Sequence, residues 1–356
     1  MGSLAALLAC TFTVAGTVLS KSQAPGDAPV LEETLTGQVN VEQVLSRDDV
    51  TRMLEHESYS HISHVDSSAL RYDGTRLSSN NLCEDRFTHG SFPCPWDHSK
   101  RWLAWGIFDS HSGWQTAGLL QRQLLSSVRR SLESEVVDAN TQQPSSAEGI
   151  RTAIMTGFVG LDKLIMDTAI DAGQSSGMLQ EKVGVLSPAF ADSCALLSLY
   201  DPSARKLYVA CTGDSRAVLG TRSADGRWQA SPLSVDQNGR NADEIARISS
   251  EHPGETGIGR NGRMLGLAVT RAFGDSRWKL PLHLQREYER RFYGPVPLTP
   301  RYGVISLPYL TAEPVVTSVE IDKNQPSFLI MASDGMWDSL LGEQAVELVR
   351  KWLDKH

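Results

Sequence analysis

The sequence has few cysteines and no closely paired ones, which argues against several classes of small metal-binding or disulfide-stabilised protein. Its five cysteines are scattered, and no two have the CxxC spacing of a zinc ribbon or a redox motif. No histidine pair has the HxxxH spacing of a zinc protease on a helix. Reduced thiols in an intracellular compartment are therefore the simplest interpretation.

The sequence also lacks a dense cluster of lysine or arginine. Its formal net charge is -8, whereas a nucleic-acid-binding face needs concentrated positive charge, so we expect no nucleic-acid partner. A phosphoprotein remains a suitable partner, because bound divalent cations reverse the local sign of the field. The hydrophobic fraction of 40% and the charged fraction of 21% are typical of a folded globular chain.

Basic residues are missing before the apolar N-terminal stretch at residues 3–20. Three readings stay open for this stretch, namely a signal-peptide core, a membrane anchor and an apolar mitochondrial leader. The next segment is polar and rich in proline, glycine and acids, which is typical of a linker. We therefore predict a leader or anchor at 1–20, a linker at 21–45 and one folded domain at 46–356.

Hydrophobic periodicity predicts strands and helices in separate runs along this domain. We expect helices at 46–56, 119–132, 150–170, 241–248 and 342–353, and strands at 102–108, 194–200, 207–211, 216–219, 228–233 and 328–332. Asn241 with Glu244 resembles a capping box. Residues 257–262 have GxGxxG spacing, but the polar stretch before them is no strand, so a dinucleotide site is disfavoured. Without regular βαβ alternation, the pattern favours a layered α+β domain.

Acidic residues recur where apolar runs end or beside glycine, at Glu84-Asp85, Asp109, Asp214 and Asp334. Hard cations such as Mg²⁺ and Mn²⁺ prefer carboxylate oxygens, and carboxylates gathered at one rim would repel one another without a cation between them. A single Asp at a strand end is usually a turn residue or a helix cap. Only the joint pattern therefore favours a binuclear metal site of the kind that activates water for attack on phosphorus.

His111 follows Asp109 by two residues on the same predicted turn. Imidazole titrates near neutrality, so this side chain is a candidate general acid for a leaving alkoxide. An isolated histidine in a turn is more often a surface hydrogen-bonding group, and the sequence alone leaves both readings open.

Four segments resemble, in order and spacing, the signature blocks of the metal-dependent protein phosphatases, the PPM or type 2C family. They are 105–113 (WGIFDSHSG), 210–219 (ACTGDSRAVL), 267–275 (LAVTRAFGD) and 328–338 (FLIMASDGMWD). Residues 308–314 (PYLTAEP) and Asn80 are similar to the pyruvate dehydrogenase phosphatase branch and its fungal mitochondrial relatives. The resemblance implies an α+β fold with a central antiparallel β-sandwich flanked by helices.

The resemblance also implies a binuclear Mg²⁺ or Mn²⁺ site with a weaker third ion. Asp109 would bridge the two ions, Glu84 and the Ser110 carbonyl would bind the second ion, and Asp334 would bind the first. Asp214 and Asp338 match the acids that hold the third ion. His111 matches the general acid.

The activity implied by the resemblance is hydrolysis of phosphoserine and phosphothreonine in proteins by a metal-bound hydroxide. The branch similarity points to a mitochondrial protein with pyruvate dehydrogenase as substrate. Residues 3–20 would then be a leader or an inner-membrane anchor, and a secretory signal or another membrane anchor is the alternative.

The sequence departs from the family pattern at several positions. Ser110 and Asp192 stand where the family typically has glycine, and Ser112 replaces a small Gly or Ala. A Cβ at 110 would restrict the turn if positive φ is needed there, and a buried charge at 192 would be costly unless metal or water meets it. The family's final Asp-Asn pair has no counterpart before His356, so the domain is expected to be C-terminally incomplete. Two hypotheses follow: a working phosphatase, or a catalytically impaired binding module on the same fold, such as a truncated gene product.

Overall fold

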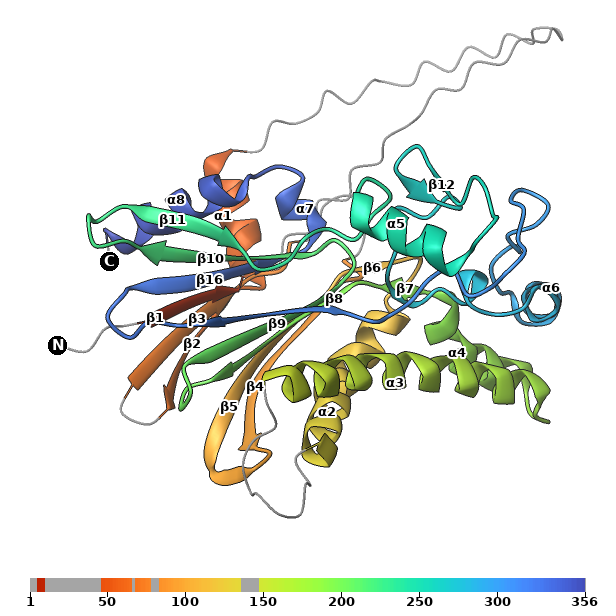
Figure 1. Ribbon diagram of the computed structural model, residues 1–356, viewed down its shortest axis with the longest axis horizontal. Helices are drawn as coiled ribbons and strands as arrows, with labels where there is room; N and C mark the ends of the chain where they lie inside the picture. Colours follow the sequence, from red (N-terminus) through yellow and green to blue (C-terminus); the bar gives the residue numbers. More distant parts are fainter. Residues whose placement is uncertain (1–4, 10–45, 66–67, 78–82, 136–146, 356) are drawn as a thin grey trace, which may run out of the picture.

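The computed structural model describes residues 5–9, 46–65, 68–77, 83–135 and 147–355, and it has two large β-sheets at its centre (Figure 1). The first sheet has the order β11-β10-β16-β1-β3-β2, formed by Trp228–Pro232, Arg216–Arg222, Ser327–Ala332, Ala5–Ala9, Ser68–Gly74 and Tyr59–Val65. The second has the order β15-β9-β8-β5-β4, formed by Val315–Glu320, Lys206–Thr212, Ala195–Asp201, Asp97–Phe108 and Arg86–Cys94.

Neighbouring strands in both sheets are antiparallel, except at β1. This strand pairs in parallel with both β16 and β3. It contains the part of the predicted leader that the structure describes; the rest of 1–20 and the predicted linker at 21–45 lie outside the described residues. Within the described ranges, none of the helices combines the length and the apolar character needed to cross a bilayer.

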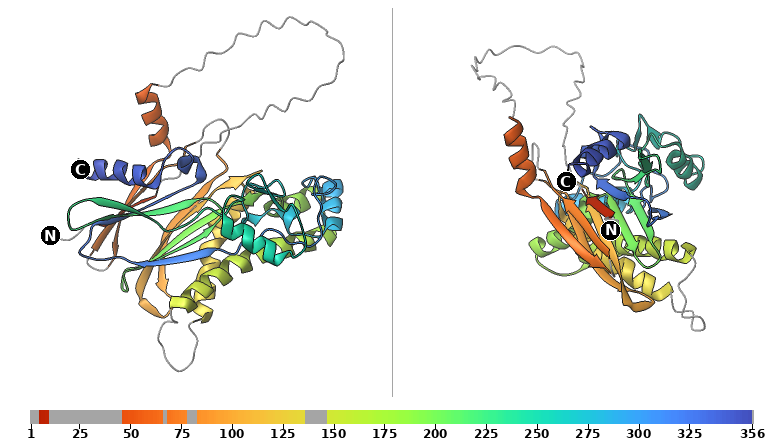
Figure 2. Two further views of the ribbon diagram at one scale, coloured as in Figure 1. Left: turned by 45° about the horizontal axis from the view of Figure 1, so that its top comes forward. Right: turned by 90° about the vertical axis from the view of Figure 1, so that its left-hand side faces the viewer.

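Helices cover the outer faces of the two sheets. Helices α2 (Gln115–Glu135) and α3 (Ala147–Gln174) lie against the second sheet, and α4 (Leu179–Phe190) packs on these two helices. Helix α8 (Gly342–Leu353) packs on β10 and β11 of the first sheet (Figure 2). The remaining helical segments are α1 (Arg47–His56), α5 (Ala242–Glu251), η1 (Ser276–Trp278), α6 (Leu282–Phe292) and α7 (Asp334–Trp337). Two short sheets, β14-β7-β6 (Phe273–Gly274, Asp192–Ser193, Ser110–His111) and β12-β13 (Gly259–Arg260, Arg263–Met264), complete the fold.

The strand β5 is buried on both faces, which explains why its sequence reads as a continuous apolar run. Trp102, Ala104 and Phe108 point toward α2 and α3, and the alternate side chains Leu103 and Trp105 point toward the first sheet. Successive side chains of a strand face opposite ways, so one strand contributes to two cores. The two sheets thus pack face to face across the second core, an arrangement compatible with the expected sandwich.

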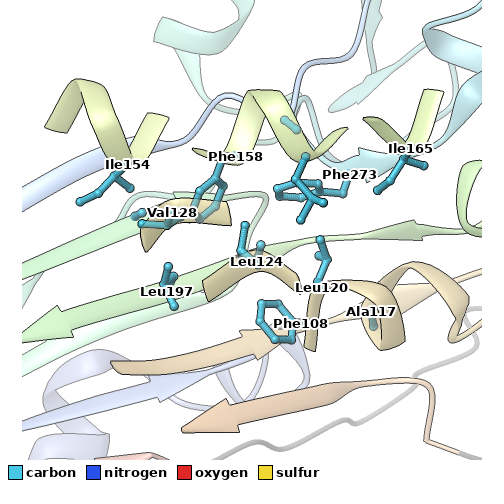
Figure 3. Packing of buried hydrophobic residues seen from close by; sticks show 14 of the residues in the cluster. Phe108, Ala117, Leu120, Leu124, Val128, Ile154, Phe158, Ile165, Leu197 and Phe273 are labelled. Atoms are coloured by element: carbon cyan, nitrogen blue, oxygen red, sulfur yellow. The ribbon is translucent and has the colours of Figure 1, made fainter. Parts of the chain in front are cut away.

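The core between the helices and the second sheet is formed by residues at helical spacing (Figure 3). Leu120, Leu124 and Val128 of α2 meet Ile154 and Phe158 of α3, and all five side chains are almost fully buried. Burying each such side chain contributes roughly 1.5–3 kcal/mol. The two helices approach closely at Gly157, where an added Cβ would lie 2.7 Å from the Val128 Cα.

The predicted α+β class with antiparallel sheets is confirmed, and every predicted helix and strand has a counterpart. Among the helices that were not predicted, α4 contains Pro188, a residue that normally ends a helix, and α6 has a mostly polar sequence. The helices predicted at 119–132 and 150–170 are both longer than expected, because α2 continues to Glu135 and α3 begins at Ala147. The GxGxxG segment takes part in the β12-β13 hairpin, so it is no strand-to-helix turn.

The predicted capping box at α5 is only half correct. The Asn241 side chain accepts hydrogen bonds from the backbone N–H groups of Asp243 and Glu244, at 3.0 and 3.4 Å. The Glu244 carboxylate turns inward instead of returning to Asn241. It accepts hydrogen bonds from Arg271 at 2.7 Å, Arg247 at 2.9 Å and the Thr270 hydroxyl at 2.7 Å.

We predict that Glu244→Gln lowers the free energy of unfolding by about 3 kcal/mol at pH 7, because it leaves Arg271 buried without its charge partner. Burial alone would raise the Glu244 pKa, but the bonds from Arg271 and Arg247 outweigh it and lower the pKa to about 2. The contribution is therefore present above the ordinary pKa of 4.5 and is lost as the pH falls toward about 2.

Urea unfolding at pH 7 and at pH 3.5 measures this difference. Glu251→Gln is the matched control, because Glu251 pairs with the same Arg247 from an exposed position. The control is expected to change stability by less than about 1 kcal/mol. Equal losses in the two variants, or a Glu244→Gln effect that grows in acid, would contradict the prediction.

A candidate metal centre at one end of the two sheets

Three carboxylates from separate elements meet at one end of the paired sheets. Asp109 follows the last residue of β5, Asp214 lies in the turn from β9 to β10, and Asp334 is the first residue of α7 after β16. One carboxylate oxygen from each residue lies within 4.8 Å of the others. The strands therefore bring together, at a single point, three acids that are far apart in the sequence.

The turn that carries Asp214 depends on a glycine and a buried amide. Gly213 has φ of +106°, and a Cβ added there would lie 2.2 Å from the Cys194 Sγ. Its N–H donates to the Gln237 Oε1 at 2.7 Å, and the Gln237 side-chain amide donates to the Cys211 carbonyl at 2.9 Å. Gln237 was not predicted from the sequence, because nothing local marks it as a partner of Gly213.

Burial and mutual repulsion shift the carboxyls of this cluster. Burial, followed by the charges of Asp85, Asp334 and Asp214, raises the pKa of Asp109 well above its ordinary value. Burial and then Asp334 raise the pKa of Asp214 to about 7. Burial and then Asp338 raise the pKa of Asp334. A converging set of all-oxygen donors that repel one another is the chemistry that a hard divalent cation satisfies, so these residues fit Mg²⁺ or Mn²⁺.

The acidic pair before β4 contacts the turn that follows Asp109. The Glu84 Oε2 accepts the Gly113 N–H at 3.0 Å, and the Asp85 Oδ1 accepts the Ser110 N–H at 3.1 Å. Asp85 is only 1% exposed and adds negative charge beside Asp109. The sequence marked both acids but assigned a role only to Glu84; Asp85 is a positioning group whose partner lies 25 positions away.

The left-handed backbone of the 109–113 turn lies at other residues than the sequence suggested. Ser110 is not among the residues with positive φ, so its Cβ does not create the restriction considered above. The left-handed residues are Ser112, with φ of +63°, and Gly113, with φ of +124°. His111 is exposed beside them, and its N–H donates to the Asp192 Oδ1 at 2.9 Å.

Asp192 is buried, which is the costly situation that the sequence raised. Its carboxylate has neighbours there, namely a backbone N–H group and a second carboxyl. Asp192 is 7% exposed, accepts the His111 N–H and interacts electrostatically with the Asp275 carboxyl. Burial raises its pKa to about 6 against the opposing effects of His111 and Asp275. Burial, followed by the Asp192 charge, raises the pKa of Asp275 well above its ordinary value, so the pair favours holding a proton between them.

Asp214 and Asp338 were expected to bind a third, weaker ion, and they lie at different places relative to the Asp109–Asp214–Asp334 cluster. Asp214 is a member of the Asp109–Asp334 group itself. Asp338 sits one turn of α7 after Asp334, where its N–H donates to the Asp334 carbonyl at 2.7 Å. The individual ion assignments therefore stay predictions. Asn80, which was noted for its similarity to one branch, lies outside the described residues.

Comparison with known proteins identifies the family to which the chain belongs. The family described as Protein phosphatase 2C matches residues 71–356. A protein phosphatase 2C homolog of Schizosaccharomyces pombe is 39% identical over 297 residues, covering 80% of this chain and 63% of the relative. The mitochondrial [pyruvate dehydrogenase [acetyl-transferring]]-phosphatase 1 of Saccharomyces cerevisiae is 35% identical, covering 88% of this chain and 56% of the relative. The chain belongs to the protein phosphatase 2C family.

A solved structure supports the fold independently. The serine-threonine phosphatase 2C of Toxoplasma gondii superposes with a TM-score of 0.52 at 16% identity, covering 84% of each chain. At that identity the likeness concerns the fold alone. The chain spans roughly three-fifths of the length of the curated relatives named above, 63% and 56% respectively.

We predict that Asp109→Asn raises the melting temperature of the metal-free protein by on the order of 2 °C, because it removes one of three repelling carboxylates. Added Mn²⁺ should raise the melting temperature of the wild type, since a ligand that binds only the folded state stabilises it. The variant should lose most of that rise. Differential scanning calorimetry with and without Mn²⁺ measures both effects.

Asp167→Asn serves as the control, because Asp167 is an exposed acid on α3 that pairs with Lys163. It should leave the Mn²⁺ response intact. A metal-free Asp109→Asn protein that melts earlier than wild type, yet keeps the full Mn²⁺ response, would show that the cluster is not a cation site.

Proposed function

We propose that this chain hydrolyses phosphoserine and phosphothreonine in proteins with the help of Mg²⁺ or Mn²⁺. The observation that carries the proposal is the convergence of Asp109, Asp214 and Asp334 at one end of the sheets, with His111 on the adjoining turn. Membership of the protein phosphatase 2C family supports the same reaction.

Each residue of the site has a separate role in the proposed reaction. Asp109, Glu84, Asp334 and the Ser110 carbonyl would hold two cations, and Asp214 and Asp338 would hold a third. When bound, the ions supply Lewis acidity toward phosphoryl oxygens and lower the pKa of water. His111 is exposed and its side chain is available to give a proton to the departing serine or threonine oxygen. Asp85 and Asp192 hold the backbone N–H groups on either side of that turn.

Phosphorylated pyruvate dehydrogenase is the substrate that we propose to test first, and the mitochondrion is the proposed location. Both proposals rest on the budding-yeast relative, a mitochondrial pyruvate dehydrogenase phosphatase that is 35% identical over 333 residues. Membrane association through residues 3–20 has no support in the described part of the chain and is not included in the proposal.

The direct test is Mn²⁺-dependent release of phosphate from a phosphothreonine peptide and from phosphorylated pyruvate dehydrogenase. The wild type should turn over, and Asp109→Asn should lose activity by at least about 100-fold, since it removes a ligand of the cations. EDTA should abolish the wild-type rate. If folded wild-type protein hydrolyses no faster than folded Asp109→Asn, the chain is a binding module on a phosphatase fold.

A second prediction isolates the role of His111. His111→Gln should lower kcat on a phosphothreonine peptide by about 100-fold or more, because the alkoxide leaves without a proton donor. The same variant should change kcat on p-nitrophenyl phosphate far less, because nitrophenolate is a stable leaving group.

His98→Gln is the matched control, an exposed histidine near the opposite end of β5. It should leave both rates unchanged. Equal losses of His111→Gln on the two substrates would assign His111 to binding or positioning instead of proton donation.

A further inference from the structure

The two residues that depart from the expected glycine pattern, Ser110 and Asp192, contact each other in the structure. Strands β6 and β7 pair antiparallel, with Ser110 opposite Ser193 and His111 opposite Asp192. The Ser110 hydroxyl lies 2.7 Å from the Asp192 carbonyl oxygen, across 82 positions of sequence. The Asp192 carboxylate in turn accepts the His111 N–H at 2.9 Å. Each residue therefore supplies a hydrogen bond that ties the turn to β7.

The same serine also closes the turn on itself. Its hydroxyl lies 2.8 Å from the Gly113 carbonyl oxygen, so its single proton is shared between that acceptor and the Asp192 carbonyl. Between these points the backbone is left-handed at Ser112, a conformation that costs a non-glycine residue roughly 1–2 kcal/mol. A strained turn of this kind persists only where its surroundings hold it.

Asp192 is itself fixed in place from the other side. Strand β7 lies between β6 and β14, where Gly274 is opposite Asp192. The backbones approach so closely that a Cβ on Gly274 would lie 2.1 Å from the Ala191 carbonyl oxygen. The carboxylate that receives the His111 N–H therefore has little freedom to move away.

We propose that Ser110 and Asp192 act together as positioning residues, a latch that holds the 109–113 turn in the conformation that presents Asp109 and the Ser110 carbonyl to a divalent cation. The inference rests on the proposed function for the identity of the cation, but it requires only binding and no turnover. Outer-shell groups that orient metal ligands typically change metal affinity by 10- to 100-fold when removed.

The test compares Mn²⁺ affinity, by isothermal titration calorimetry, with melting temperature in the metal-free protein. Ser110→Ala and Asp192→Ala should each weaken Mn²⁺ binding by about tenfold. The double variant should lose less than the product of the two single losses, because either change alone already frees the turn. Asp192→Asn keeps an acceptor oxygen for the His111 N–H and should bind Mn²⁺ nearly as wild type does. If Asp192→Ala does not fold, the loss of about tenfold expected of Ser110→Ala still tests the proposal.

The controls make the same chemical changes away from the turn. Ser187→Ala removes a hydroxyl that donates to the Val183 carbonyl within α4. Asp201→Ala removes a carboxylate that is 8% exposed and accepts backbone N–H groups at the far end of β8. Both are expected to lower the melting temperature without changing Mn²⁺ affinity.

The proposal is overturned if Ser110→Ala and Asp192→Ala bind Mn²⁺ within twofold of wild type, if their losses multiply independently, or if the wild type binds no Mn²⁺. A wild type that binds Mn²⁺ through this latch but hydrolyses no phosphopeptide would instead contradict the proposed function and leave the latch supported.

Discussion

Repulsion among Asp109, Asp214 and Asp334 opposes folding of the chain around its own site. Burial raises the pKa of each, the charges of Asp334 and Asp214 raise that of Asp109 further, and the charge of Asp334 also raises that of Asp214. The acids nevertheless converge, because each is attached to an element anchored in a hydrophobic core. Phe108 precedes Asp109, Cys211 lies at the end of β9, and the buried residues of β16 lead to Asp334. Core packing therefore holds the three carboxylates together, and a bound cation would relieve the repulsion among them.

Hydrogen bonds to the backbone hold the carboxylates at their positions. The Asp109 carbonyl accepts the Cys194 N–H and the Ser193 hydroxyl, each at 2.9 Å. The Gly213 turn is held by Gln237, and the Gly113 N–H is held by Glu84. A site preorganised in this way needs little rearrangement to receive a cation, which is the property that electrostatic catalysis depends on. The same bonds explain why positions without reactive groups matter to the site.

The elements that show a local periodic pattern could be predicted from the sequence. Contacts between residues that are far apart in the sequence could not. The continuous apolar run at 102–108 and the acid after it marked a strand that ends at the site. The partners of Asp85, Gln237 and Glu244 depend on strand register and loop packing, which composition and periodicity do not encode. The contact between Ser110 and Asp192 spans 82 positions. Helix α4 was missed because Pro188 is a local signal against a helix, which packing against α2 and α3 overrides.

The account depends on a divalent cation lying among the three carboxylates. Anomalous diffraction from crystals soaked in Mn²⁺ tests this most directly, because it locates the ion without reference to activity. The account predicts a strong anomalous peak within about 2.5 Å of carboxylate oxygens from Asp109 and from at least one of Asp214 and Asp334. A well-ordered cluster with no anomalous peak at saturating Mn²⁺ would contradict it.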